Sequence, residues 1–233
     1  MPAPTNPHKA ALAQYCRRAS VYDVELALFE PIRRTAVARL GLRPGDTVID
    51  AGCGTGLSLP LLHHAVGARG RIVGIEQCPE MLAKARECVQ RHRWQNVTLI
   101  AASAEDAEIE FTAITAATSH RADAVLFHFT HDILRSPAAV ANVMRALRPG
   151  AGVVACGLKW SALWAWPVNL FVLGAALHSV SSLAGLARPW SLLADRLDRF
   201  KADSAAAGAV FVARGMVRAS VPPVPGSALN FEV

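Results

Sequence analysis

Residues 48–56, Val-Ile-Asp-Ala-Gly-Cys-Gly-Thr-Gly, limit the fold of this chain more than any other segment. Val48 and Ile49 suit a buried strand, Asp50 ends it, and glycine then occupies every second position. An apolar helical pattern follows over residues 57–66. Glycine lets the backbone bend sharply and lets a ligand approach the main chain closely. The segment therefore predicts a strand, a ligand-binding loop and a helix in immediate succession.

The strand-and-helix pattern recurs along the chain. Apolar, β-branched runs predict further strands at residues 71–76, 96–101, 122–129 and 152–158, and helical spacing is found at residues 79–91 and 137–147. Such alternation predicts a parallel sheet covered by helices on both faces. Residues 191–197 can form a further helix, and two last strands are expected at residues 200–206 and 209–217.

A helix is also expected before this core, at residues 23–40, where apolar side chains recur at helical spacing. Pro31 predicts a kink or a late start of this helix, and Arg33, Arg34 and Arg39 are expected on its outside.

The composition places the chain among globular proteins. Hydrophobic residues make up 52 % and charged residues 18 % of 233 residues, which excludes disorder for most of the chain and fits one large domain. The net charge of +6 comes from scattered residues, so it does not indicate a nucleic-acid binder. The 5 cysteines show no metal-ligand spacing, which argues against a disulfide framework or a metal site and favours a reducing cytoplasm. The first ten residues lack the apolar stretch of a secretory signal.

The second expected strand ends in Glu76, an acid that can accept hydrogen bonds from both hydroxyls of a ribose. The dinucleotide fingerprint GxGxxG would place its third glycine where this chain has Leu57, so a nicotinamide oxidoreductase is disfavoured. Asp50 at the loop entrance would repel a pyrophosphate but suits an ammonium group. These residues favour a ligand with an adenosine end and a cationic amino-acid end, which describes S-adenosylmethionine.

In combination, three motifs resemble the class I S-adenosylmethionine-dependent methyltransferases: Asp50-Ala-Gly-Cys-Gly-Thr-Gly, Gly74-Ile-Glu76 with Met81 in the next helix, and Leu147-Arg-Pro-Gly150. The resemblance covers about residues 40–158 and implies a Rossmann-like α/β fold. Its seven-stranded sheet would have helices on both faces and an antiparallel hairpin at the end, with an N-terminal helical lid and a helical insert before the hairpin. The expected parts of this one domain are a helical cap (1–40), a cofactor-binding core (41–158), an apolar lid or insert (159–198) and a hairpin with tail (199–233).

The resemblance also implies roles for single residues. The methionine end of the cofactor would lie against the loop, Glu76 would bind the ribose, and Gln77 and Met81 would flank the adenine. Ser103 stands where the family often has an aspartate that meets the adenine amino group. The loop residues concerned are Asp50, Ala51, Gly52, Cys53, Gly54 and Gly56, and the segment after the third strand adds Ala104 and Glu105 beside Ser103.

Tyr15 and Tyr22 lie in a segment that resembles the N-terminal part of small-molecule and phospholipid N-methyltransferases, where it folds over the cofactor. The alternative is that both tyrosines pack a helix against the core.

His128 and His131 follow the fourth strand, at the edge where parallel sheets place their ligands. Either histidine, or Tyr22, is a candidate catalytic residue, and His128 is also a candidate cofactor contact. In the structural alternative His128 packs beside the sheet and Asp132 caps the next helix. An amine that arrives unprotonated needs mainly in-line placement against the methyl group, so a general base is not obligatory.

Between Lys159 and Arg188 lie 28 residues without a charged side chain. This length would cross a bilayer, but Pro167 and the polar residues disfavour a span, as does the return of the chain to the same sheet. A lid or interfacial helix is expected instead, and Trp160, Trp164 and Phe171 are its candidate acceptor-binding residues.

The sequence thus predicts a methyltransferase that uses S-adenosylmethionine and no metal, acts on a small or lipid-like acceptor, and favours nitrogen. The alternatives are an O- or C-methyltransferase of an aromatic or secondary metabolite, and a non-catalytic cofactor-binding or membrane-docking subunit. The expected partners are the acceptor and at most a peripheral membrane surface, without nucleic acid. A monomer or homodimer in the cytoplasm, or at the membrane periphery, is expected.

Overall fold

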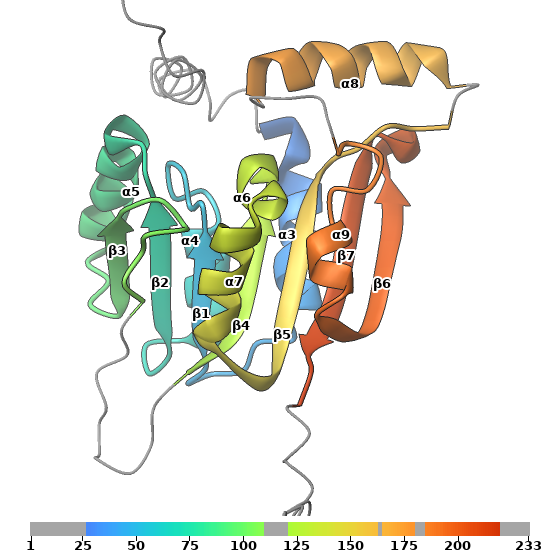
Figure 1. Ribbon diagram of the computed structural model, residues 1–233. Coiled ribbons are helices and arrows are strands. Elements are labelled where there is room, and N and C mark those ends of the chain that lie inside the picture. Colours follow the sequence, from blue (N-terminus) through green and yellow to red (C-terminus); the bar gives the residue numbers. More distant parts are fainter. Residues whose placement is uncertain (1–26, 110–120, 163–164, 180–184, 220–233) are drawn as a thin grey trace, which may run out of the picture.

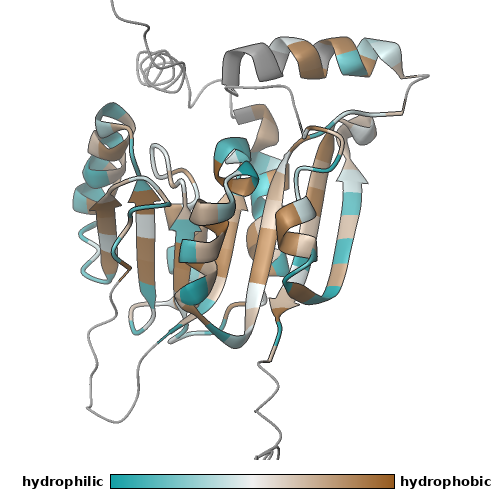
Figure 2. Cartoon of the chain, in the orientation of Figure 1, coloured by the Kyte–Doolittle hydropathy of each residue, from teal (hydrophilic) through white to brown (hydrophobic). Residues whose placement is uncertain are grey.

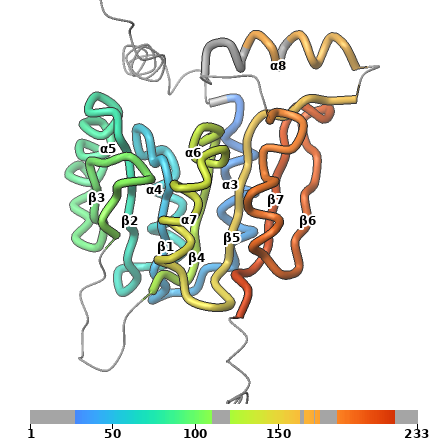
Figure 3. The backbone as a smooth tube through the Cα atoms, in the orientation of Figure 1, coloured from blue at the N-terminus to red at the C-terminus, as the bar shows by residue number. Residues whose placement is uncertain are grey.

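The computed structural model describes residues 27–109, 121–162, 165–179 and 185–219. Within these residues, a 7-stranded sheet has the order β3-β2-β1-β4-β5-β7-β6 (Figures 1 and 3). The first five strands pair in parallel, whereas β7 is antiparallel to both β5 and β6. This arrangement confirms the predicted Rossmann-like sheet and its antiparallel final pair.

The strands are β1 (Thr47–Ala51), β2 (Arg71–Glu76), β3 (Val97–Ala101), β4 (Ala122–His128), β5 (Leu147–Leu158), β6 (Leu197–Ala205) and β7 (Val210–Val217). The helices are η1 (Ala27–Phe29), α3 (Glu30–Arg39), α4 (Leu59–Val66), α5 (Pro79–His92), α6 (His131–Arg135), α7 (Pro137–Arg145), α8 (Trp166–Ser179), α9 (Ser191–Ala194) and η2 (Ala206–Gly208). Several features differ from the expectation: among them, α9 ends at Ala194 instead of 197, and β6 begins at Leu197 instead of 200. β5 begins before the expected residue 152, because Leu147 already pairs with Ala122, and the short helix α6 was not foreseen.

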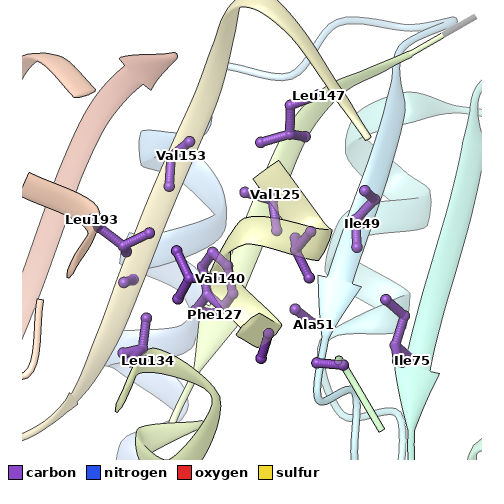
Figure 4. Packing of buried hydrophobic residues seen from close by; sticks show 14 of the residues in the cluster. Ile49, Ala51, Ile75, Val125, Phe127, Leu134, Val140, Leu147, Val153 and Leu193 are labelled. Atoms are coloured by element: carbon purple, nitrogen blue, oxygen red, sulfur yellow. The ribbon is translucent and has the colours of Figure 1, made fainter. Parts of the chain in front are cut away.

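Alternate side chains of the central strands enter two apolar layers, one on each face of the sheet, and Figure 2 shows these strands as mainly hydrophobic. On one face, Leu134, Val140 and Leu193 from α6, α7 and α9 pack around Val125 and Phe127 of β4 (Figure 4). On the opposite face, α3, α4 and α5 cover the sheet. Because both faces of the central strands are covered, these strands are mainly apolar and do not alternate between apolar and polar residues.

The helix α3 starts late, as Pro31 predicted, and Pro31 lies in its first turn. The prediction that Arg33 lies on the outside of this helix is wrong, because only 2 % of the surface of Arg33 is exposed. Arg33 follows Phe29 by one helical turn and precedes Val37 by another, so it lies on the inward face of α3. The charge of the side chain suggested exposure, whereas the spacing already indicated burial.

The helix α8 lies beyond the carboxyl ends of the parallel strands (Figure 1). Val172 is fully buried in an apolar cluster with Leu158 and Leu186, whereas Trp166 and Leu170 are 69 % and 61 % exposed. Asn169 Oδ1 accepts a hydrogen bond from the backbone N–H of Ser161 at 2.8 Å, which ties α8 to the end of β5. In the part of the chain that the structure describes, no helix is both long and apolar enough to cross a membrane.

The cysteine pattern predicted no disulfide framework. Cys53, Cys88 and Cys156 form no disulfide, but Cys78 is disulfide-bonded. One bond is not a framework, yet it departs from the fully reduced state that a reducing cytoplasm would favour.

Candidate active site

The order of the strands reverses between β1 and β4. From β1 the chain builds β2 and β3 on one side, and it then returns to add β4 and β5 on the other. Open α/β sheets bind ligands at such a point, beyond the carboxyl ends of the strands. A small cavity, partly open to solvent, lies there; it is lined by Arg33, Asp50, Gly52, Cys53, Gly54, Thr55, Leu57, Ser58 and His128.

The loop after β1 depends on glycine for both conformation and space. Gly52 and Gly56 have φ angles of +77° and +87°, which residues with a side chain rarely adopt. A Cβ atom on Gly52 would lie 2.4 Å from Cγ2 of Thr130. A Cβ atom on Gly56 would lie 3.2 Å from Cα of Ala85 in α5. The loop therefore fits tightly between the segment after β4 and the helix after β2.

Glu76, at the end of β2, holds this loop in place. Its carboxylate accepts hydrogen bonds from the backbone N–H groups of Gly54 at 3.0 Å and Cys78 at 2.8 Å. Burial raises the pKa of Glu76, although these backbone donors act in the opposite direction. Each carboxylate oxygen has a second lone pair, so the predicted bonds to ribose hydroxyls are compatible with this arrangement.

Asp50 is the least satisfied acid of the site. It is 1 % exposed, and neither carboxylate oxygen has a hydrogen-bond partner. Burial raises the pKa of Asp50 to about 7, with the charge of Arg33 lowering it and that of Glu76 raising it. Since a buried, unpartnered carboxylate is costly, the site favours a cationic hydrogen-bond donor beside Asp50.

The structure separates the two histidines that follow β4. His128 lines the cavity, is 8 % exposed, and its Nε2 atom has no partner. Burial, helped by the charge of Arg33, lowers the pKa of His128 to about 3, so this side chain is neutral near pH 7. His131 is the first residue of α6, is also buried, and is not among the residues that line the cavity.

Cys53 also lines the cavity, and burial raises the pKa of its thiol, followed by the charges of Asp50 and Glu76. A thiol whose pKa is raised forms little thiolate, so Cys53 is a packing residue rather than a nucleophile.

The other predicted cofactor contacts are spread around the ends of β1, β2 and β3. Gln77 is exposed, whereas Met81 is fully buried. The hydroxyl of Ser103 donates a hydrogen bond to Asp106 at 2.7 Å, and Glu105 accepts one from Ser136 at the start of α7. Ala51 ends β1, and Ala104 is buried.

The residues predicted to bind the acceptor lie only in part within the described chain. Trp160 is half-buried against the apolar cluster beneath α8. Tyr15, Tyr22 and Trp164 lie outside the described residues, as does the side chain of Phe171, whose backbone belongs to α8.

The predicted site residues omitted Thr55, Leu57 and Ser58, which line the cavity, and two residues with buried polar atoms, Arg33 and Thr130. Arg33 lines the cavity, and its Nε and Nη2 atoms are buried without a partner. The hydroxyl of Thr130, next to the loop, is likewise buried without one. Helical spacing could have identified Arg33, and the position of Thr130 between His128 and His131 places it at the same edge of the sheet. The contact of Thr130 with the loop at Gly52 depends on packing, which the sequence does not show.

Comparisons with known proteins agree with this geometry. A family model described as a methyltransferase domain matches residues 42–170. The chain is 34 % identical over 128 residues to an uncharacterized 37.1 kDa protein in transposon TN4556 of Streptomyces fradiae, which covers 53 % of this chain and 33 % of that protein. It is 32 % identical over 146 residues to the phosphatidylethanolamine N-methyltransferase of Cereibacter sphaeroides, which covers 62 % of this chain and 66 % of that enzyme.

The chain thus spans less than two thirds of the length of either relative. Among solved structures, a SAM dependent methyltransferase from Aquifex aeolicus has a TM-score of 0.58 at 19 % identity. The match covers 87 % of this chain and 98 % of that one, and it shows a shared fold.

Proposed function

The chain belongs to the class I S-adenosylmethionine-dependent methyltransferases, and on this premise we propose that it methylates a small or lipid-like acceptor, with nitrogen as the favoured atom. The observation that carries the proposal is the cavity between β1 and β4, where a glycine loop meets an unpartnered buried acid. The name of the relative from Cereibacter sphaeroides supports nitrogen and a phospholipid acceptor.

The residues around the cavity fit S-adenosylmethionine. Its ammonium group would give Asp50 the cationic donor that this carboxylate lacks, and binding would favour the ionised form of the acid. The glycines let the main chain approach the amino-acid part of the ligand. Glu76, on the neighbouring strand, is placed to bind the ribose while it accepts a hydrogen bond from the backbone N–H of Gly54.

When bound, S-adenosylmethionine supplies an electrophilic methyl group on its sulfonium. The chain itself contributes placement. The loop after β1 and Glu76 hold the cofactor, and the site at the carboxyl ends of β1 and β4 positions the acceptor in line with the methyl group. His128 is neutral near pH 7, because its pKa is lowered to about 3, so it acts through a hydrogen bond at Nε2 and does not store a proton. An acceptor amine that enters without its extra proton needs no stronger base.

Aromatic side chains connect His128, at the cavity, to the apolar cluster beneath α8. The ring of His128 lies 4.9 Å from that of Phe129, which lies 4.7 Å from that of Phe29 (centroid distances). Phe29, Phe129 and Trp160 all pack against the cluster that contains Val172 of α8. An acceptor reaching His128 from this side would meet aromatic surface, which supports an aromatic or aliphatic acceptor over a bare polar amine.

Methyl transfer from S-adenosylmethionine labelled in its methyl group tests this function. The acceptor panel contains phosphatidylethanolamine in vesicles, apolar amines and phenols, and the readouts are release of S-adenosylhomocysteine and the methylated atom. We expect label on nitrogen of an apolar amine or of the phospholipid. Label on oxygen or carbon would contradict the favoured atom. Cofactor binding without turnover of any acceptor would instead support a non-catalytic subunit.

A further inference from the structure

Arg33 of α3 is a buried cation whose hydrogen bonds are incomplete. It is 2 % exposed, and its Nη1 atom donates to the carboxylate of Glu30 one turn earlier. Its Nε and Nη2 atoms are buried without a partner. Leaving charged donors unpaired in the interior is costly, so this arrangement indicates a missing acceptor.

The two unpaired nitrogens belong to one edge of the guanidinium plane, where their N–H bonds run side by side. This fork matches the two oxygens of a carboxylate, and such bidentate pairs are strong and specific in direction. Glu30 occupies Nη1, and Glu30 is also paired with Arg34 at 2.9 Å, so it is engaged on the helix side. The fork of Arg33 remains for a group in the cavity that Arg33 lines.

The opposite charge in the same cavity belongs to Asp50. No hydrogen bond or ion pair joins Arg33 to Asp50, although the charge of Arg33 lowers the pKa of Asp50. Two residues that line the same cavity thus carry one unsatisfied cationic fork and one unsatisfied carboxylate. A ligand with a carboxylate and an ammonium group on the same carbon complements both.

We propose that the Nε–Nη2 edge of Arg33 binds the carboxylate of the cofactor's methionine end, opposite the ammonium group beside Asp50. The proposal rests on the proposed function and assigns to α3 a role in cofactor selection. Because the fork binds only the carboxylate, Arg33 distinguishes the intact cofactor from derivatives that lack this one group.

Calorimetric binding of two ligands tests the proposal without turnover. One is S-adenosylhomocysteine and the other is its decarboxylated analogue, S-adenosyl-3-thiopropylamine, which keeps the nucleoside, the sulfur and the amine. In the unaltered protein we expect the carboxylate to strengthen binding about 10- to 100-fold. Arg33→Met should remove this difference: affinity for S-adenosylhomocysteine falls by that factor, while the analogue binds as before.

Two further variants complete the test. Arg34→Met is the matched control, because Arg34 is the exposed neighbour on α3 and its side chain is 66 % exposed; it should keep the full preference. Arg33→Lys keeps the charge but loses the fork, so an intermediate preference is expected. Binding of the analogue to each variant shows that the cavity has folded.

The results that would overturn the proposal differ from those that would overturn the function. Equal binding of both ligands by the unaltered protein contradicts it, even if no Arg33 variant folds. The proposal is also contradicted if Arg33→Met lowers the affinity for both ligands equally, which would mean that Arg33 only positions Asp50. An Arg33→Met variant whose affinity for both ligands is unchanged contradicts it as well. If the unaltered protein binds neither nucleoside, the proposed function itself fails.

Discussion

The site holds four largely buried ionisable groups, those of Arg33, Asp50, Glu76 and His128. Burial and the charges of these groups together determine the pKa values in the site. Burial raises the pKa values of Asp50 and Glu76 and lowers that of His128. Arg33 moderates the first of these shifts and adds to the last. The site is therefore arranged for a ligand that carries charge, and the free protein bears the cost of charges without partners.

The pH dependence of stability should reveal the buried acid. The pKa of Asp50 is about 7 in the folded protein and 3.8 ordinarily, so between these values the folded state holds a proton that the unfolded chain has released. The free energy of unfolding consequently falls as pH rises through this window and levels off above it. From about pH 5.5 to about pH 8 this one carboxyl contributes a fall of about 2 kcal/mol.

Asp50→Asn has no such proton to lose, so its unfolding free energy should fall less over the same interval. Urea unfolding of both proteins at the two pH values measures the difference. Identical pH dependence of the two proteins would contradict the raised pKa.

Glu76→Ala should lower the affinity for S-adenosylhomocysteine about tenfold or more, because charge-assisted hydrogen bonds are lost to the ribose and to Gly54. Calorimetry measures the affinity, and thermal unfolding checks that the variant is folded. Glu87→Ala, on an exposed position of α5, is the control and should bind as the unaltered protein does. An unchanged affinity of Glu76→Ala would remove the ribose assignment.

At the scale of elements, the loop after β1 lines the cavity, and the helix α8 lies beyond the carboxyl ends of the strands (Figure 1). The strands and the longer helices could be predicted because each carries its own run of apolar residues. The early start of β5 could not, since it depends on the distant partner Ala122, and α6 is too short to show a helical period. The local motif likewise located Asp50 and Glu76. Arg33 joins the site only through the packing of α3 against β4 and β5.

Gly56→Ala tests how tightly the loop is packed. The new Cβ atom would lie 2.9 Å from Cδ1 of Leu59 and 3.2 Å from Cα of Ala85, at a φ of +87°. We expect unfolding free energy to fall by about 2–4 kcal/mol, from strain and overpacking together. Gly41→Ala has a φ of +63° but no atom within 4 Å, so only about 1 kcal/mol should be lost. Equal losses in urea unfolding would show that packing against α5 is not limiting.

Trp160→Ala tests whether the apolar cluster beneath α8 contacts the acceptor. Trp160 packs into the cluster beneath α8, so its loss should raise the apparent KM for an apolar acceptor while affinity for S-adenosylhomocysteine stays the same. Trp166→Ala, at a position 69 % exposed, is the comparison and should leave a dissolved acceptor's KM unchanged. If Trp166→Ala alone impairs turnover, and only with acceptor in vesicles, α8 contacts a lipid surface and does not line the acceptor site.

At the scale of the whole molecule, the strand order sets the position of the cavity. The reversal between β1 and β4 brings the glycine loop, His128 and the inward face of α3 to one edge, although they are far apart in the sequence. The order of strands and helices along the chain predicted this edge, because parallel strands share their carboxyl ends. The proposed acceptor side depends on α8, whose apolar composition alone predicts no geometry.

Calorimetric titration of the unaltered protein with S-adenosylhomocysteine, and separately with NAD, tests the central claim most directly. The account predicts one binding site per chain for S-adenosylhomocysteine, with a dissociation constant below about 1 mM, and no binding of NAD. Binding of NAD, or no binding of S-adenosylhomocysteine at millimolar concentration, would contradict it.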